Sequence, residues 1–202
     1  LASGIIYIMA FRSKSASEFN VMKRFREHRT EIILVGLAII LGTALRFYEL
    51  GNLPMVIDGD EGLIGLHAQS TTEGDLANPF SLWENFGSLY LQVVNWGFEL
   101  FGTSPFSLRL IPAISGVLAI PAVYLLARQI TGPRIATIAA FLLATSHAHI
   151  HFSRIASVGY IHDTWLVPLE LYLILSALEK RSSWRAAAGG VLLAIHFRVY
   201  LT

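Results

Sequence analysis

A tight cluster of carboxylates, Asp58-Gly59-Asp60-Glu61, is the part of this sequence best suited to chemistry. A carboxylate can act as a general base toward a hydroxyl group, or it can hold a divalent cation beside a phosphate leaving group. The same residues also fit a helix start, with Asp58 as the N-cap, Glu61 completing a capping box and Asp60 favoured by the helix dipole. Both interpretations stay open at this point.

A run of alternating histidines, His147, His149 and His151, is followed by Arg154. In a strand the three imidazoles would share one face and could bind a metal, whereas in a helix they would point in different directions and could not converge. An arginine close to a membrane surface can bind a phosphate, or it can extend toward lipid headgroups.

Further ionisable residues fall inside apolar segments. Asp163 and Glu170 lie two helical turns apart on one face, and His196 and Arg198 follow in the next apolar segment. Such residues are costly at membrane depth and usually face a cavity or one another. They therefore either hold helices together as ion pairs or line a site for an anionic substrate.

The composition predicts the kind of element that must position these residues. The chain is 54% hydrophobic and only 14% charged, against about 25% charged residues in an average soluble domain. The apolar residues occur in blocks and the mean hydropathy is +0.56, which predicts an all-α integral membrane protein. A net charge of +1 gives no reason to expect a nucleic-acid partner, and the lack of cysteine excludes disulfides and thiolate chemistry.

The apolar blocks predict about five transmembrane helices. Their approximate bounds are 32–47, 106–127, 135–146, 160–178 and a last segment that begins near 186. Basic residues precede the first block and fill the second and fourth connections (Lys23, Arg24, Arg26, Arg29, Arg128, Arg134, Lys180, Arg181, Arg185). The positive-inside rule therefore places the N-terminus in the cytoplasm.

The loop 48–104 is predicted to be extracytoplasmic, because it contains carboxylates but no lysine or arginine. One short helix should begin after Asp58. A second should cover Leu89–Phe101, where Ser88, Gln92, Asn95 and Glu99 form a narrow polar stripe typical of a membrane interface. The loop is thus expected to be two interfacial helices joined by a polar, turn-forming linker.

The order of motifs along the chain is distinctive: "LRFYELGNLP", then "DGDEG", then "LFGTSPFSLRLIPAISGVLAIPAVYLLARQITGPRIATIAAFLLATSHAHIHFSRIA". This order resembles the N-terminal part of the C-type (GT-C) membrane glycosyltransferases, in the branch of protein mannosyltransferases and aminoarabinose transferases. The resemblance covers about residues 32–202 and is most specific over 101–156. The chain departs from the family at 87–89, where Gly-Ser-Leu replaces a frequent Pro-Pro-Leu step, and in being shorter than most members.

The resemblance implies a function and a set of site residues. Such enzymes transfer a sugar, with inversion, from a polyprenyl-phosphate donor to a protein, lipid or glycan acceptor at the outer side of the plasma membrane. The family's acidic pair falls on Asp60 and Glu61, with Asp60 as the expected base. Arg154 and Asp163 match positions expected to bind the phosphate or the lipid donor. No metal site is expected from the resemblance, although a divalent cation is compatible with it.

A second hypothesis from another class is a truncated, non-catalytic relative that serves as a structural subunit among other membrane subunits. The expected domain division is a cytoplasmic segment 1–31 and an incomplete GT-C-like transmembrane domain 32–202. Residues 1–21 are expected to precede a natural start at Met22, because the basic flank of the first transmembrane helix begins there.

Overall fold

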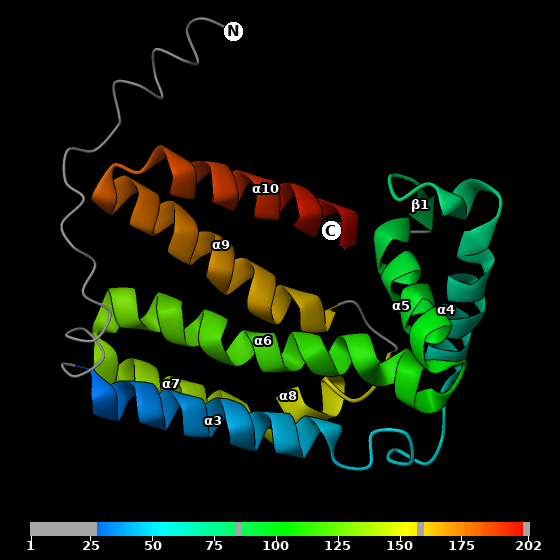
Figure 1. The fold of residues 1–202 in the computed structure, drawn as a ribbon, viewed down its shortest axis with the longest axis horizontal. Coiled ribbons are helices and arrows are strands. Elements are labelled where there is room, and N and C mark those ends of the chain that lie inside the picture. Colours follow the sequence, from blue (N-terminus) through cyan, green and yellow to red (C-terminus); the bar gives the residue numbers. More distant parts are fainter. Residues whose placement is uncertain (1–27, 84–85, 157–159, 200–202) are drawn as a thin grey trace, which may run out of the picture.

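The apolar segments fold into a bundle of long helices, with shorter elements gathered at one end of it (Figure 1). The computed structural model describes residues 28–83, 86–156 and 160–199. The bundle helices are α3 (Arg29–Phe47), α6 (Pro105–Thr131), α7 (Pro133–Thr145), α9 (Tyr160–Lys180) and α10 (Ser183–Val199). The expectation about residues 1–21 lies outside the described residues, and the domain division stays a prediction.

The shorter elements connect the bundle helices. They are α4 (Gly59–Gln69), η1 (Ser70–Thr72), η2 (Asp75–Ala77), β1 (Leu82–Trp83), β2 (Phe86–Gly87), α5 (Ser88–Phe101) and α8 (His147–Phe152). The two strands pair antiparallel as a small ribbon. The two predicted helices of the outer loop are therefore present as α4 and α5, and the linker between them is more structured than expected.

The predicted fold class, an all-α membrane protein, is confirmed. Among the residues that the structure describes, three helices, α3, α6 and α9, are long and apolar enough to cross a membrane. Helix α7 has 13 residues and rises only about 20 Å, less than the ~30 Å of a hydrocarbon core. The predicted number of about five crossings therefore stays a prediction.

Successive bundle helices alternate in direction (Figure 1). Helices α3, α7 and α10 run toward the end that carries α4 and α5, whereas α6 and α9 run away from it. The turn between α6 and α7 is a single residue, Gly132, with a φ of 90° that favours glycine. The expected turn over 128–134 is thus mostly helical, because α6 continues to Thr131.

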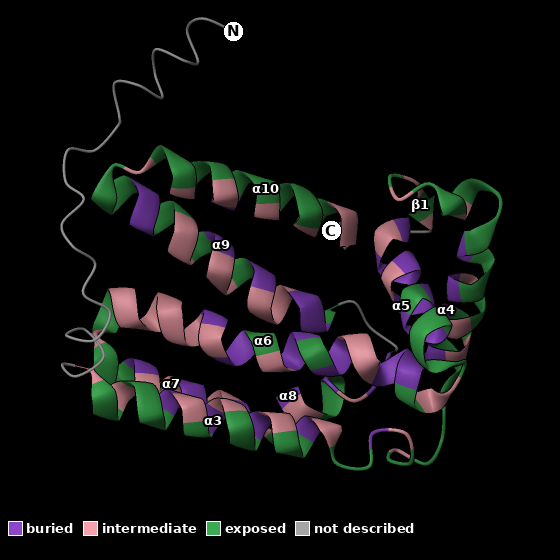
Figure 2. Cartoon of the chain, viewed as in Figure 1, coloured by how far each residue is buried: buried purple, intermediate pink, exposed green. Residues whose placement is uncertain are grey.

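The outward faces of α3 and α10 are exposed (Figure 2), and large hydrophobic side chains are among their exposed residues. Ile40 on α3 is 67% exposed and Val191 on α10 is 62% exposed. A soluble protein rarely exposes so continuous an apolar surface, while a bilayer covers it at no cost. The burial pattern therefore agrees with a bundle surrounded by lipid.

Close helix packing at the centre of the bundle depends on small residues. A Cβ atom built on Gly116 of α6 would lie 2.1 Å from the Ser153 hydroxyl and 2.9 Å from Nε of Arg46. A Cβ atom on Gly42 of α3 would lie 2.2 Å from the end of the Ile120 side chain. Glycine at these positions lets α3, α6 and the segment after α8 come together at the site described next.

Three of the four residues in the polar stripe of α5 face inward rather than toward water, and the fourth, Glu99, is exposed. Ser88 is fully buried, and Gln92 and Asn95 are 9% and 8% exposed. The Ser88 hydroxyl donates to the Asn78 carbonyl, and Gln92 Nε2 donates to the carbonyls of Leu76 and Ala77 at 2.9 and 3.0 Å. The stripe thus fixes the linker against α5, while Trp96 on the opposite side is 51% exposed.

Candidate active site

The N-terminus of α4 holds the predicted acidic cluster. Asp58 caps the helix, since its Oδ1 accepts a hydrogen bond from the Glu61 backbone N–H at 2.8 Å. The predicted second half of the capping box is not observed, because the Glu61 side chain turns inward to another partner. Asp60, in the first turn, is exposed.

Glu61 forms a buried, bidentate ion pair with Arg109 of α6. The Arg109 Nε donates to Glu61 Oε1 at 2.9 Å and its Nη2 donates to Oε2 at 2.8 Å. Glu61 is 1% exposed and Arg109 is 0% exposed. The backbone N–H of Ala156 also donates to Glu61 Oε1. These contacts fasten α4 to α6 and to the segment after α8.

Arg109 also forms hydrogen bonds to the loop between α3 and α4. Its Nη1 donates to the carbonyls of Leu50 and Pro54, and its Nη2 donates to the carbonyl of Val56. One guanidinium therefore holds three backbone carbonyls of the loop that leads to Asp58 and the start of α4. No signal in the sequence indicated that Arg109 belongs to the candidate site, apart from its position at the end of an apolar segment.

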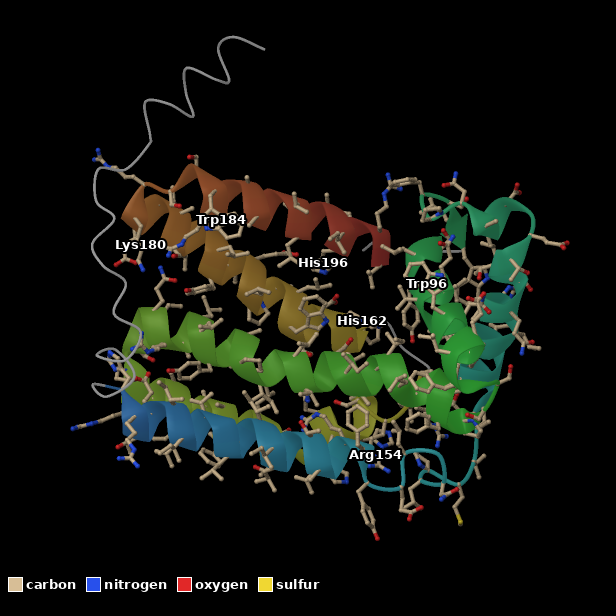
Figure 3. The ribbon with its side chains drawn as sticks, viewed as in Figure 1. Trp96, Arg154, His162, Lys180, Trp184 and His196 are labelled. Atoms are coloured by element: carbon tan, nitrogen blue, oxygen red, sulfur yellow. The ribbon has the colours of Figure 1, made fainter. Side chains whose placement is uncertain are left out.

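Arg154 binds the end of α3. Its Nη1 donates to the carbonyls of Leu45 and Arg46, and its Nη2 donates to the carbonyl of Leu53. Burial, and then the positive charge of Arg109, lower the pKa of Arg154. The last carbonyls of a helix carry partial negative charge, so they are natural partners for a cation. Figure 3 shows Arg154 beside the end of α3, near the loop before α4.

Arg46 is a third arginine of this region, and it is completely buried. Its Nη1 donates to the carbonyls of Gly42 and Ala144, and its Nη2 donates to the Leu143 carbonyl and to Nδ1 of His149. Within the described residues it has no carboxylate partner. Arg46 is thus satisfied mainly by the C-terminal ends of α3 and α7. Of the three arginines, Arg109 alone is ion-paired within the described residues, with Glu61.

The three predicted histidines do not meet. The segment is the helix α8, so the strand alternative is wrong. His149 points inward and is 9% exposed, while His147 and His151 are exposed. No group of three His, Asp or Glu side chains able to hold a metal is found in the described ranges.

His149 is held as a neutral imidazole. Its Nδ1 accepts from Arg46 Nη2 at 2.7 Å, which leaves the proton on Nε2, 3.1 Å from the Thr164 hydroxyl. Burial, and then the charge of Arg46, lower the pKa of His149 to about 4. His149 lies in α8, outside the helices long enough to cross the membrane.

We expect stability to fall as the pH drops from about 6.5 to 4. In this window an unfolded His149 binds a proton and the folded one does not, so acid favours unfolding. Because His149 is not fully enclosed, the expected loss is about 1–2 kcal/mol. Unfolding midpoints in detergent at pH 7 and pH 4.5 measure it. His149→Gln should reduce the pH dependence and His147→Gln, at an exposed site, should not; equal pH profiles for both variants would contradict the assignment.

Asp163 and Glu170 of α9 share one partner, His196 of α10. His196 Nε2 lies 3.0 Å from Asp163 Oδ1, and its Nδ1 lies 2.9 Å from Glu170 Oε1. The predicted common face of the two carboxylates is confirmed. Arg198 is not their partner: it donates to the Phe80 carbonyl and lies over the Phe80 ring. Figure 3 shows His196 between α9 and α10.

A buried aromatic contact lies between the outer elements and the bundle. Tyr90 of α5 and His162 of α9 are 3% and 4% exposed, and their rings meet edge to face with centroids 4.8 Å apart. His162 Nδ1 pairs with the Ser115 hydroxyl at 2.9 Å. Burial, and then the charge of Glu61, raise the pKa of Tyr90. Tyr90 and His162 were not singled out from the sequence, because an aromatic or a histidine in an apolar stretch is usually part of the core.

Of the predicted site residues, Asp60, Glu61 and Arg154 lie at the same end of the bundle, and Asp163 lies in the first turn of α9 at that end (Figure 1). Asp163 makes no hydrogen bond to the other three within the described residues. Its side chain is 33% exposed, which keeps it accessible beside His196. Their roles in binding or catalysis stay predictions.

Comparison with known proteins gives one match. The family described as dolichyl-phosphate-mannose-protein mannosyltransferase matches residues 89–202, which is more than half of the 202-residue chain. The matched part contains α5 to α10, with Arg154 and Asp163, and begins after Asp60 and Glu61. No curated protein and no solved structure matches the chain. The chain therefore belongs to the dolichyl-phosphate-mannose-protein mannosyltransferase family, a family of membrane glycosyltransferases.

Proposed function

We propose that the protein transfers a sugar from a polyprenyl-phosphate-linked donor to a protein, lipid or glycan acceptor on the extracytoplasmic side of the plasma membrane. Membership in a membrane glycosyltransferase family supports a lipid-linked donor and a membrane environment. The sidedness is supported by charge: the basic residues Arg29, Arg134 and Arg181 lie at the end of the bundle opposite α4 and α5 (Figure 1).

The observation that carries the proposal is the difference in environment between the adjacent carboxylates of Asp60 and Glu61. Glu61 is locked to Arg109, while Asp60, one residue before it, is exposed and has no side-chain bond within the described residues. A residue that is held in place by its neighbour but keeps its own side chain free fits a general base. Asp60 is therefore the proposed base, and Glu61, though predicted as catalytic too, is proposed to position it.

The proposed reaction is a single displacement with inversion. Asp60 takes the proton of the acceptor hydroxyl as the acceptor oxygen attacks the anomeric carbon. The bond between that carbon and the phosphate oxygen breaks, and its electron pair leaves with the lipid phosphate. Asp60 ends the step protonated and later returns the proton to water.

The three arginines are proposed to favour the departing phosphate. Arg109 is ion-paired with Glu61, whereas Arg46 and Arg154 bind uncharged partners within the described residues, so two guanidinium charges have no carboxylate bound to them. A fixed positive field aimed at a leaving phosphate lowers the barrier without reorganisation. Arg154 is the only one of the three that is not fully buried, so it is the proposed direct contact. Asp163, partly exposed beside His196, is proposed to contact the donor from α9.

A transfer assay tests the function itself. The full-length protein, reconstituted in vesicles, is given a polyprenyl-phosphate mannose donor and an acceptor peptide rich in serine and threonine. We expect free lipid phosphate and mannosylated peptide to appear in equal amounts. Free lipid phosphate with an unmodified peptide would indicate another acceptor. Donor that stays intact with peptide, lipid and glycan acceptors would contradict the proposal and favour the non-catalytic subunit.

A further inference from the structure

A groove runs between α3 and α7 at the end of the bundle opposite the candidate active site. Its mouth is a hollow of about 630 Å³ lined by the first residues of the two helices, including Arg29, Glu31, Pro133 and Arg134. A second hollow of about 450 Å³ continues it, and the two share Leu34, Thr137 and Ile138 in their linings. Figure 1 shows both helices starting at this end.

The mouth of the groove is positively charged. Arg29 and Arg134 are both exposed, and neither side chain forms a hydrogen bond or ion pair within the described residues. The one carboxylate of the mouth, Glu31, is already bound by Arg128, with further contacts from Tyr124 and His28. The N-termini of α3 and α7 add their unpaired backbone N–H groups to the same place. The mouth is therefore suited to an anion.

The continuation of the groove is apolar. Its lining is Leu34, Thr137, Ile138, Phe141, Leu142 and Thr145. The two threonine hydroxyls at 137 and 145 donate to the carbonyls of Pro133 and Phe141, so they present methyl groups instead of free polar atoms. Ile138 and Leu142 are 59% and 67% exposed. A ligand that follows the groove must be charged at one end and apolar along its length.

We propose that this groove binds a membrane phospholipid with an anionic headgroup. The headgroup phosphate lies between Arg29 and Arg134, and one acyl chain follows α7 past Ile138 and Leu142. Basic pockets between transmembrane helices are suited to anionic lipid headgroups, and the apolar part of the groove lies where a bilayer supplies acyl chains. The site is separate from the sugar-donor site, because it occupies the other end of α3 and α7 (Figure 1).

Lipid retention tests the proposal. The full chain is purified in a neutral detergent and mixed with dioleoylphosphatidylglycerol or with the zwitterionic dioleoylphosphatidylcholine, and bound lipid is counted by native mass spectrometry. We expect the anionic lipid to bind more tightly. Each basic residue near a headgroup contributes roughly fivefold in affinity, so Arg29→Gln/Arg134→Gln should weaken binding about 25-fold. Both side chains are exposed, so the double variant should melt like the wild type without lipid.

A matched control separates the groove from general surface charge. Lys180→Gln/Arg181→Gln removes two basic residues at the same end of the bundle but outside this groove, and it should leave binding unchanged. Glycerol phosphate, which has the anion without the acyl chains, should not compete for the site. Equal loss of lipid in both double variants, undiminished binding after Arg29→Gln/Arg134→Gln, or full competition by glycerol phosphate would each overturn the proposal.

Discussion

Replacing Asp60 with asparagine should lower the rate of sugar transfer by about 10²–10⁴-fold, the usual contribution of a general base. Asparagine keeps the size and most of the polarity of the side chain, but it cannot accept the acceptor's proton. Since Asp60 is exposed and its side chain has no bond within the described residues, the variant should fold normally. The loss should appear in kcat, because the interaction that is removed forms only as the hydroxyl reacts.

Asp58→Asn is the control for this experiment. Asp58 is two residues away, is also exposed, and caps α4 through Oδ1. Asparagine caps a helix about as well as aspartate, so the control removes a nearby negative charge without disturbing the helix start. Transfer by Asp58→Asn should stay close to the wild-type rate. Wild-type rates for Asp60→Asn, or equal losses for both variants, would remove Asp60 from the role of base.

The positions of the helices followed from the sequence because the signals for them are local. Long apolar blocks gave α3, α6 and α9 to within a few residues at most ends. The carboxylate cluster gave the start of α4, and the 3.6-residue period of the polar stripe gave α5. Turn chemistry was less well predicted, because Gly132 alone makes the turn that seven residues were expected to form.

The surroundings of each helix face could not be predicted from the pattern of polar and apolar residues along the helix. The polar stripe of α5 indicated water, but Ser88 and Gln92 instead bind the backbone carbonyls of the linker. A linker without its own regular ladder has unpaired carbonyls, and buried amides or hydroxyls are the groups that can satisfy them. The 3.6-residue repeat of polar residues shows that one face of a helix is polar. Tertiary packing decides whether water or another part of the protein covers that face.

The arginines of the site could not be predicted as a group for a similar reason. Arg46 and Arg109 both stand at the end of an apolar block, where a side chain can equally extend to the surface or turn inward. Their partners are distant in sequence, since Glu61 and Arg109 are 48 residues apart and Arg46 and Ala144 are 98 apart. By contrast, the shared face of Asp163 and Glu170 was predictable, and only their partner His196 was not.

Replacing Arg109 with methionine should destabilise the protein by about 3–5 kcal/mol, the cost of removing one member of a buried ion pair. The change leaves the carboxylate of Glu61, 1% exposed, without its cation. It also removes the donors to the carbonyls of Leu50, Pro54 and Val56, which then lack that partner. Unfolding by a denaturing detergent measures the loss. Arg181→Met, at an exposed position, serves as the control and should change stability little.

The double variant Glu61→Leu/Arg109→Met gives the sharper result. Replacing Glu61 as well removes the buried carboxylate that Arg109→Met leaves unpaired. The double variant should therefore be more stable than Arg109→Met alone by at least about 1 kcal/mol. Additive losses would show that the two side chains act separately and would contradict the ion pair.

The double variant also separates stability from catalysis. If the pair acts by fixing the loop that leads into α4 and Asp60, transfer should stay low in the double variant even where stability is regained, because the bonds from Arg109 to the loop carbonyls are still missing. Recovered stability with recovered transfer would instead mean that the pair only holds α4 to α6. Stability without transfer identifies Glu61 and Arg109 as the residues that place Asp60, which is the step on which the proposed chemistry depends.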